Sequence, residues 1–419
     1  MMICGAFLCL LPLAPPSARI RGMNTTDNAA DAEFFRQRQV VLGPDSHGVI
    51  RTNLCGLSGC LSVLRWKLFR LASRFFLGKT FGDAMLGLSA SLDFEDEQVL
   101  GDLRSHVTAH DTISDPETVF YDYHGSVPQC FRSASAYGTK SAWLLRNVFV
   151  SPKHGAIWTP EGKLLQESVT NLAVFYLFGG PKETLLSAKM IADETPFVPF
   201  RSNLVYYHTL LDDLPQLLHA LDFRPDSRIL LSRNHPGYID DMLAFLGIDP
   251  SRIVLSDSPL MVRFCVFVPK LTRTSFIRPC DLNRLRAALL PRIAESGHGR
   301  RIYISRRGTK LRAFSNEKEL EDVLRADGFE ILRFEDMPFA DQLTAVRSSR
   351  VIVAPHGSGL ANLVAAREGT RVVEISPSYW LRSTFPRLCS QLGLDHRMVL
   401  CDTDRIPVDQ VLNAINGKE

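Results

Sequence analysis

Apolar and polar residues follow two different spacings in the last third of the chain, and these spacings predict alternating strands and helices. Short β-branched runs indicate buried strands, whereas apolar residues three and four positions apart indicate helices. The predicted strands are residues 301–305, 329–334, 351–355 and 371–375, and the predicted helices are residues 316–326 and 339–347. This βαβαβαβ order is typical of a parallel sheet with helices on both faces.

Similar patterns upstream predict a second α/β region. They indicate strands near residues 147–150, 228–231 and 252–255 and helices at residues 204–221, 238–246 and 282–295. The last of these helices follows a boundary that we expect between residues 270 and 282. We therefore predict a poorly defined N-terminal region at 1–105 and two Rossmann-like domains at 106–275 and 276–419.

The strand predicted at 351–355 ends in a turn whose backbone can bind an anion. The turn residues are His356, Gly357, Ser358 and Gly359. Free N–H groups at the start of a helix attract negative charge, and glycines let a phosphate approach the main chain. An ordinary strand-to-helix turn is the alternative interpretation. Asn362 belongs to the same predicted site, where we expect it to brace the turn rather than to touch ligand.

Basic residues are concentrated between residues 300 and 312. They are Arg300, Arg301, Arg306, Arg307, Lys310 and Arg312, with no acidic residue among them. Guanidinium groups pair bidentately with phosphate, so we expect Arg306, Arg307 and Arg312 to bind a diphosphate. A solvated basic loop is the alternative. Nucleic acid is not an expected partner, because no aromatic residues interleave with the cluster and the pI is about 8.4.

His208 and Asp212 are four residues apart in a predicted helix, so their side chains share one face. A carboxylate there can orient an imidazole, or both groups can converge on a substrate hydroxyl. We expect Asp212 to act as the base with His208 as its partner or alternative. A pair that only supports local structure remains open. A metal site is not expected, because two ligands on one helix need further partners.

Composition agrees with two globular domains. The chain has 419 residues, of which 45% are hydrophobic and 22% charged, with a net charge of only +3. It can therefore bury two ordinary cores and is not of a disordered or fibrous type. Nine cysteines form no metal-type pair, so reduced thiols in a cytoplasmic setting are expected, without structural disulfides.

The first hundred residues give weaker signals. Residues 2–14 are apolar but lack a preceding basic residue and are too short to span a bilayer, so they resemble a poor signal peptide, and Met23 is an alternative start. Residues 61–79 interleave basic and large apolar side chains, as in a helix that lies on an anionic membrane. This segment predicts peripheral contact with the inner membrane, and packing against its own domain is the alternative.

Several motifs in one order resemble glycosyltransferase family 61, whose members are also described as capsular polysaccharide biosynthesis proteins. The matching stretches are residues 206–215 (Tyr-x-His-x-x-x-Asp-x-Leu-Pro), 302–307, 312, 316–317, 328–329, 338–342, 355–362 and 372–374. Ser358 and Ala361 differ from the more usual turn, but both are small and leave its backbone role intact. Gln216 stands where a basic residue is common, which puts one acceptor contact in doubt.

The resemblance implies a GT-B-like arrangement, in which two Rossmann-like domains face each other across a cleft and the C-terminal one holds the donor. It implies an inverting transfer from a nucleotide-sugar to a saccharide or lipid-linked acceptor, in surface or capsular polysaccharide synthesis. We expect no cofactor and no metal requirement. Glu374, at the end of the last strong strand, is a candidate acceptor for ribose hydroxyls, or else a surface acid.

Two other functions stay open at this point. One is a noncatalytic protein that binds a nucleotide-sugar. The other is a hydrolase with Ser358 as nucleophile, which is weaker because the surrounding residues do not form a Gly-x-Ser-x-Gly element.

Overall fold

The computed structural model describes residues 107–113, 118–120, 134–136, 140–158, 164–165, 168, 188–201, 205–269, 277–294, 297–309, 312–380 and 382–417. The predicted N-terminal region at 1–105, the basic segment at 61–79 within it, and Lys310 lie outside the described residues. None of the helices in the described part of the chain is both long and apolar enough to cross a membrane.

The C-terminal part contains a sheet of five parallel strands in the order β13-β12-β14-β15-β16. These strands are β12 (Arg300–Ile304), β13 (Glu330–Leu332), β14 (Ser349–Pro355), β15 (Arg371–Pro377) and β16 (Asp395–Cys401). The first strand in the chain thus lies between the second and the third. This confirms the predicted parallel α/β sheet and gives it a doubly wound strand order of the 2-1-3-4-5 type.

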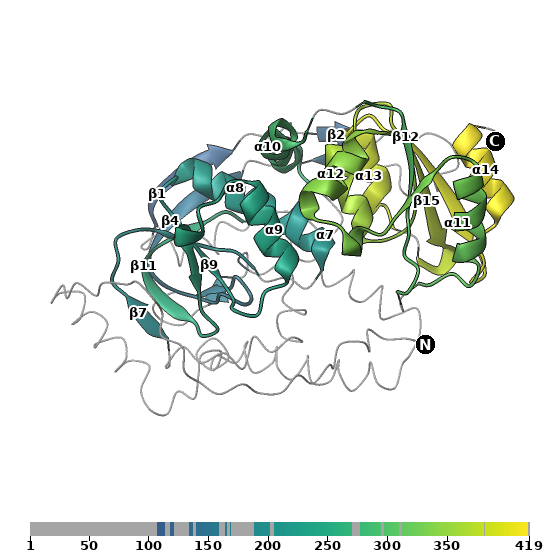
Figure 1. The fold of residues 1–419 in the computed structure, drawn as a ribbon. Coiled ribbons are helices and arrows are strands. Elements are labelled where there is room, and N and C mark those ends of the chain that lie inside the picture. Colours follow the sequence, from purple (N-terminus) through teal and green to yellow (C-terminus); the bar gives the residue numbers. More distant parts are fainter. Residues whose placement is uncertain are drawn as a thin grey trace, which may run out of the picture.

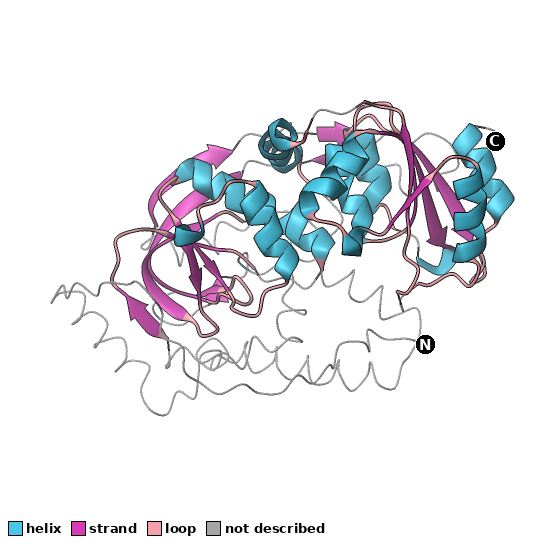
Figure 2. Ribbon diagram, in the orientation of Figure 1, coloured by secondary structure: helices cyan, strands magenta, loops and turns pink. Residues whose placement is uncertain are grey.

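Helices cover both faces of this sheet, as Figures 1 and 2 show. The helices are α11 (Glu317–Ala326), α12 (Phe339–Arg347), α13 (Thr384–Gln391) and α14 (Val408–Asn416). Alternate residues of β12 point to opposite faces, because side chains in a strand alternate. Tyr303 packs with α11 and α14 on one face, whereas Ile302 and Ile304 pack with α12 and α13 on the other.

The other large sheet has nine strands and mixed direction. Its strands are β1 (Val107–Ile113), β4 (Lys140–Val150), β5 (Ile157–Trp158), β6 (Leu164–Leu165), β7 (Lys189–Ile191), β8 (Phe197–Pro199), β9 (Arg228–Leu231), β10 (Ile253–Leu255) and β11 (Leu260–Phe267). Strands β7, β8, β9, β10 and β11 pair in parallel, whereas β4 pairs antiparallel with β1, β5 and β11. A separate antiparallel pair joins β2 (Thr118–Phe120) to β3 (Ala134–Ala136).

The predicted helix at 204–221 is divided into three parts, α7 (Tyr206–His208), a π-helical turn (Thr209–Asp213) and α8 (Leu214–Phe223). The N–H of Leu214 donates to the carbonyl of Thr209, five residues earlier, which is the π-helical spacing. Pro215 follows directly and has no N–H to continue the ordinary ladder. The sequence therefore widens the helix just where Asp212 lies.

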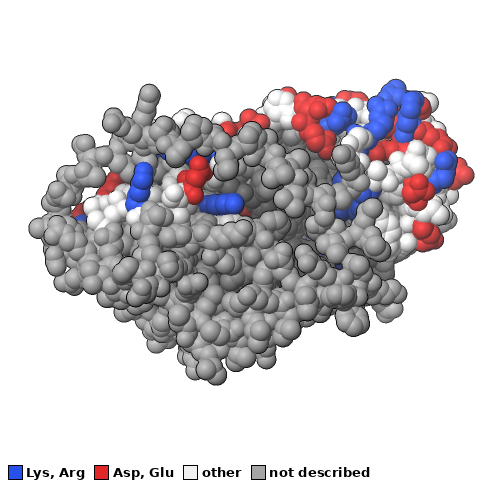
Figure 3. Space-filling model, turned by 90° about the horizontal axis from the view of Figure 1, so that it is seen from below, with Lys and Arg blue, Asp and Glu red and all other residues white. Residues whose placement is uncertain are grey.

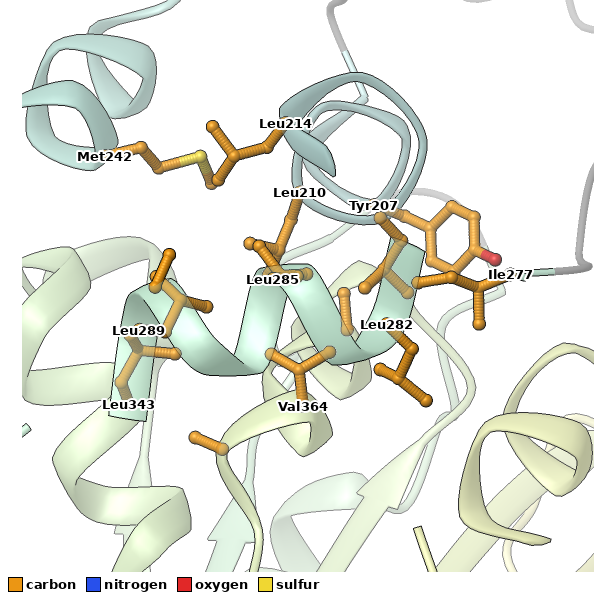
Figure 4. Packing of buried hydrophobic residues seen from close by; sticks show 14 of the residues in the cluster. Tyr207, Leu210, Leu214, Met242, Ile277, Leu282, Leu285, Leu289, Leu343 and Val364 are labelled. Atoms are coloured by element: carbon orange, nitrogen blue, oxygen red, sulfur yellow. The ribbon is translucent and has the colours of Figure 1, made fainter. Parts of the chain in front are cut away.

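A single buried apolar cluster connects the two sheets. Helices α9 (Gly237–Phe245) and α10 (Pro279–Leu289) contribute to it together with α8, α12 and α13. Figure 4 shows Leu282, Leu285 and Leu289 of α10 beside residues from both parts of the chain, including Leu210 and Val364. Arg286 of the same helix donates to the carbonyl of Val364 at 2.5 Å. Helix α10 therefore packs against both halves.

The predicted elements and the observed ones differ mainly in the first sheet. The predicted strands at 228–231 and 252–255 correspond to β9 and β10, and the predicted helix at 339–347 matches α12. The antiparallel strands around β4 and the long strand β11 were not predicted. Instead of an α-helix, the stretch after Gly357 forms a 3-10 helix (Ser358–Ala365). Further 3-10 turns occur at Pro250–Arg252, Leu290–Arg292 and Phe334–Asp336.

Truncation of Leu285 to alanine is expected to destabilise the protein, because this side chain is fully buried between the two halves. Leucine-to-alanine changes in a packed core cost about 2–5 kcal/mol of unfolding free energy. Urea unfolding of Leu285→Ala measures this loss. The control is Asn283→Ala on the exposed side of α10, for which we expect a change within about 0.5 kcal/mol. Equal stability of the two variants would show that α10 does not hold the halves together.

Candidate active site

The candidate site begins where the strand order of the C-terminal sheet reverses. From β12 the chain continues to α11 on one face, and from β14 it continues to the 3-10 helix Ser358–Ala365 on the other. Ligands of such sheets bind beyond the carboxyl ends of the strands at this switch point. Arg306 follows β12, His356 follows β14, and the Arg306 guanidinium donates to the carbonyl of His356 across the gap. Two separately predicted motifs are thus in direct contact.

Gly357 makes this contact possible. A Cβ placed on it would lie 2.5 Å from Nη1 of Arg306, closer than real side-chain contacts allow, and 3.0 Å from its Cδ and Cζ, which is unusually close. The backbone of Gly357 is extended, so the requirement is for space rather than for an unusual dihedral angle. Burial lowers the pKa of Arg306, and the nearby carboxylates of Glu335 and Glu317 oppose this effect. An arginine nevertheless stays charged in proteins.

Two acidic residues of α11, Glu317 and Glu321, form hydrogen bonds to residues at the end of β12. The carboxylate of Glu317 accepts from the backbone N–H of Arg306 at 2.7 Å and from the Tyr303 hydroxyl at 2.9 Å. Ser305 Oγ donates to Glu321 at 2.6 Å. Burial raises the pKa of Glu317, although both hydrogen bonds counteract it. The backbone that carries Arg306 is therefore positioned by buried polar groups.

Glu374 lies beneath the turn rather than beside an open surface. Its carboxylate is fully buried and accepts from Nδ1 of His356 at 2.5 Å and from Nε2 of His396 at 2.8 Å. Although burial raises the pKa of Glu374, the two histidine hydrogen bonds outweigh it and hold the pKa at about 2. The predicted contact between Glu374 and ribose does not fit this position, because both oxygens are bonded inside the protein. Glu374 instead anchors His356.

The basic residues predicted as one cluster separate into two groups. Arg300 pairs with Glu330 and Arg301 with Asp327, next to the start of β12 and away from its carboxyl end. Figure 3 shows basic and acidic side chains interspersed on the C-terminal part of the molecule, at the right of the view. At the carboxyl end, Arg307 is half-exposed and lies 3.5 Å from Glu321.

Arg312 lies beside the loop that follows β15. Its guanidinium carbon is 5.1 Å from the centroid of the Trp380 ring. Because β14 lies between β12 and β15, this contact joins the loops on either side of the His356 turn. Arg306, Arg312 and the turn therefore occupy neighbouring positions at one edge of the sheet.

The His208 and Asp212 side chains are bonded as their spacing predicted. Nδ1 of His208 and Oδ2 of Asp212 are 2.6 Å apart. The Asp212 side chain is 1% exposed, whereas that of His208 is 28% exposed. Burial raises the pKa of the neighbouring Tyr207, and the charge of Asp212 adds to this shift. The imidazole, rather than the carboxylate, is the part of this pair that reaches solvent.

Hydrogen bonds and ring contacts connect this pair to the glycine turn. The Tyr206 hydroxyl donates to Oδ1 of Asn362 at 2.6 Å, and Nδ2 of Asn362 donates to Oε1 of Gln342 at 2.9 Å. Asn362 is fully buried and thus braces the turn.

A second connection runs through aromatic rings. The Tyr207 ring lies 5.2 Å from that of His208 and 5.9 Å from that of Phe385, and Phe385 lies 5.2 Å from His356. The structure therefore brings the two predicted halves of the site together.

A second buried polar cluster lies where β4, α8 and α10 contact one another. The Lys140 ammonium donates to Asp281 and, at 2.7 Å, to Oε1 of Gln216. Burial raises the pKa of Asp281, but the charge of Lys140 together with the hydrogen bonds to His219 and Lys140 outweighs this effect and holds the pKa well below its usual range. Gln216, predicted to affect an acceptor contact, is thus a partner of Lys140.

This cluster also contains three groups at metal-ligand spacing. Ligand atoms of His219, Cys280 and Asp281 lie within 4.8 Å of one another. The Lys140 ammonium contacts the same Asp281 oxygen that His219 contacts at 3.1 Å. A cation from the chain therefore already neutralises this carboxylate, and these residues do not fit a metal site in this arrangement.

A small pocket lies at the carboxyl ends of β8 and β11. Its volume is about 40 Å³, and its polar lining comes from Ser168, Arg201, Asp213 and Gln216. The Arg201 guanidinium and the Asp213 carboxylate form an ion pair there. One water molecule occupies roughly 10–15 Å³ of such a cavity, so the pocket can hold a few waters but not a sugar ring.

Comparison with known proteins agrees with the motifs. Residues 206–373 match the family model Glycosyltransferase 61, and this region contains His208, Asp212, Arg306 and the glycine turn. The predicted resemblance is confirmed over these residues, where the chain is similar to glycosyltransferase family 61. The chain is also similar to Beta-1,2-xylosyltransferase RCN11 of Oryza sativa subsp. japonica, with 29% identity over 111 residues. That stretch is 25% of this chain and spans about a fifth (21%) of the length of the relative.

Several residues of the site were not predicted from the sequence. Tyr206 and Gln342 lie within the recognised motifs, but the spacing of the motifs does not predict that the two side chains contact each other. Phe385 and Trp380 lie outside the motifs, and nothing in their spacing connects them to the turn. Only the fold reveals these contacts; Tyr206, for example, lies 136 residues from Gln342 and 156 from Asn362 in the sequence.

The ion pairs of Glu374 predict a defined pH dependence of stability. Its pKa falls from about 4.5 to about 2 on folding, so its charge stabilises the fold fully above pH 4.5, and this contribution is lost as the pH falls toward 2. We expect Glu374→Gln to have a lower unfolding free energy than wild type at pH 6, and this difference should become smaller between pH 4.5 and 3. Urea unfolding at several pH values measures the difference. A difference that does not change with pH would contradict the assigned role.

Proposed function

We propose that this chain is an inverting glycosyltransferase that moves a sugar from a nucleotide-sugar donor to a hydroxyl of a saccharide or lipid-linked acceptor. The observation that carries the proposal is the contact between Arg306 and the His356 turn at the switch point of a parallel sheet. The family match over the same residues supports it. A leaving diphosphate needs fixed positive charge and hydrogen-bond donors, and this sheet edge offers both.

The donor half of the reaction rests on the C-terminal sheet. Arg306 is fixed to the turn by its own hydrogen bond, so its guanidinium is placed before a ligand arrives. Backbone N–H groups at the start of the 3-10 helix add donors beside it. Arg307 and Arg312 supply further charge at this edge. Such preorganised groups stabilise the charge that develops on the leaving group without rearrangement.

For the acceptor half we propose His208 as the base and Asp212 as the residue that orients it. The Asp212 carboxylate accepts the hydrogen bond, so Nδ1 of His208 carries the proton and Nε2 keeps a lone pair. That nitrogen can take the proton of an acceptor hydroxyl as its oxygen attacks the anomeric carbon. This reverses the preference for Asp212 drawn from the sequence, because Asp212 is 1% exposed.

Several finer features belong to the same proposal. They are a GT-B-like arrangement of domains at 106–275 and 276–419, a cytoplasmic or membrane-peripheral location, a role in surface or capsular polysaccharide synthesis, and a reaction without a metal. The two sheets and the base-to-turn connections support the first of these. The name of the relative adds xylose to the sugars worth testing as the donor.

Purified protein should release nucleotide from one of a panel of nucleotide-sugars when an acceptor is present. We expect His208→Ala to lower kcat by about 10²–10⁴-fold with little change in donor affinity, since a base acts in the chemical step. Arg306→Ala should lower kcat by about 10²–10³-fold and also weaken donor binding. Steady-state kinetics together with calorimetry separates these two effects.

The chain offers matched controls for both variants. Arg300→Ala removes an arginine at the opposite end of β12, and His298→Ala removes a histidine bonded to Thr370 near the same end. Both should retain wild-type kcat and donor affinity. Nucleotide-sugar binding without turnover of any donor would favour the noncatalytic binder. Full activity of His208→Ala and Arg306→Ala would remove the proposed roles.

A further inference from the structure

We propose that the loop after β15 is the site where the nucleobase of the donor binds, with Tyr379 stacking on the base. In this arrangement Arg312 and Arg382, both held against Trp380, bind the diphosphate. The inference rests on the proposed function and adds a ligand contact that the family motifs do not include. Four features of the loop carry it.

The first feature is position. Strand β15 ends at Pro377, and the 3-10 helix Ser378–Trp380 follows at once. Trp380 is held to the strand end, since Ser376 Oγ donates to its carbonyl at 3.3 Å. The loop therefore lies at the carboxyl edge of the sheet, one strand away from the His356 turn. A nucleotide whose diphosphate lies at the turn has its base within reach of a neighbouring loop.

The second feature is the exposure of an aromatic ring. Tyr379 is 74% exposed, and it is the one aromatic side chain among the large hydrophobic groups exposed in the described residues. The other two, Met190 and Val205, lie outside the C-terminal sheet. An exposed aromatic ring provides a stacking surface for any planar base.

The third feature is the pair of guanidinium groups beside Trp380. The guanidinium carbon of Arg382 is 4.3 Å from the ring centroid, and that of Arg312 is 5.1 Å from it. Cation–π contacts of this kind restrict where a long arginine side chain points. Two guanidinium groups held near one ring concentrate positive charge, and they suit a ligand that carries two phosphate groups.

The fourth feature is backbone strain. Arg312 has a φ of 56°, in the left-handed region that side chains other than glycine rarely adopt. Among the described residues only Asn147 shares this property. Such strain concentrates at functional sites, where the surrounding structure maintains it. The residue with this backbone conformation is also the one whose guanidinium lies near Trp380.

Calorimetry on the full chain with UDP, GDP and inorganic pyrophosphate tests the proposal. We expect Tyr379→Leu to weaken the nucleoside diphosphate that wild type binds by about 5- to 150-fold, the range that loss of base stacking gives. Pyrophosphate affinity should stay unchanged, because it has no base. Tyr379→Phe keeps the ring and should bind as wild type does, whereas Arg382→Gln should weaken both kinds of ligand. Arg325→Gln, on the exposed side of α11, is the control and should change neither.

The outcomes separate this inference from the proposed function. If wild type binds a nucleoside diphosphate and Tyr379→Leu binds it equally well, the base site is wrong while the glycosyltransferase proposal stands. If Tyr379→Leu loses pyrophosphate affinity to the same extent, the ring does not act on a base and the inference is also wrong. If wild type binds neither nucleoside diphosphates nor any nucleotide-sugar, the proposed function fails and the inference fails with it.

Discussion

The contact between the Arg306 guanidinium and the carbonyl of His356 is the interaction on which the rest of the site depends. It joins the ends of two adjacent parallel strands whose following segments leave toward opposite faces of the sheet. Glycine at position 357 leaves room for the guanidinium. The buried acids Glu317 and Glu374 hold the Arg306 backbone N–H and the His356 imidazole, respectively. This arrangement places a fixed guanidinium group beside backbone N–H donors, and such groups stabilise negative charge.

The His208–Asp212 pair and the glycine turn form one assembly. Tyr206 and Asn362 connect them by a hydrogen bond between residues 156 positions apart, and the rings of Tyr207 and Phe385 fill the space beside it. The apolar cluster around α10 continues this packing into both sheets. A rigid connection of this kind suits a reaction in which a base and a leaving-group site must be held at a set separation.

The sequence predicted the parts of the structure that local patterns encode. β-branched runs and helical spacing gave the strands and helices of the C-terminal sheet, and the i, i+4 spacing of His208 and Asp212 gave their contact. The strands around β4 were missed, since a mixed sheet depends on pairing between distant segments rather than on a local period. The ribose contact predicted for Glu374 was wrong, because its burial between His356 and His396 cannot be read from the sequence. That burial depends on strands β14, β15 and β16 lying side by side.

Arg300 and Arg301 show that residues close together in the sequence can be separated by the fold. In the sequence they belong to one basic run with Arg306 and Arg312. However, Arg300 and Arg301 are the first residues of β12, where they pair with acids, whereas Arg306 and Arg312 follow the other end of the strand. Charge density along a chain predicts an anion site only when the fold brings those charges to the same edge. The positions of Arg306 and Arg312 meet this condition.

A crystal structure of the protein with a bound nucleoside diphosphate tests the central claim most directly. The account predicts diphosphate oxygens within about 3.2 Å of the Arg306 guanidinium or of the backbone N–H groups at Gly357 to Gly359. A diphosphate bound at the amino edge of the C-terminal sheet, or on the first sheet alone, would contradict it.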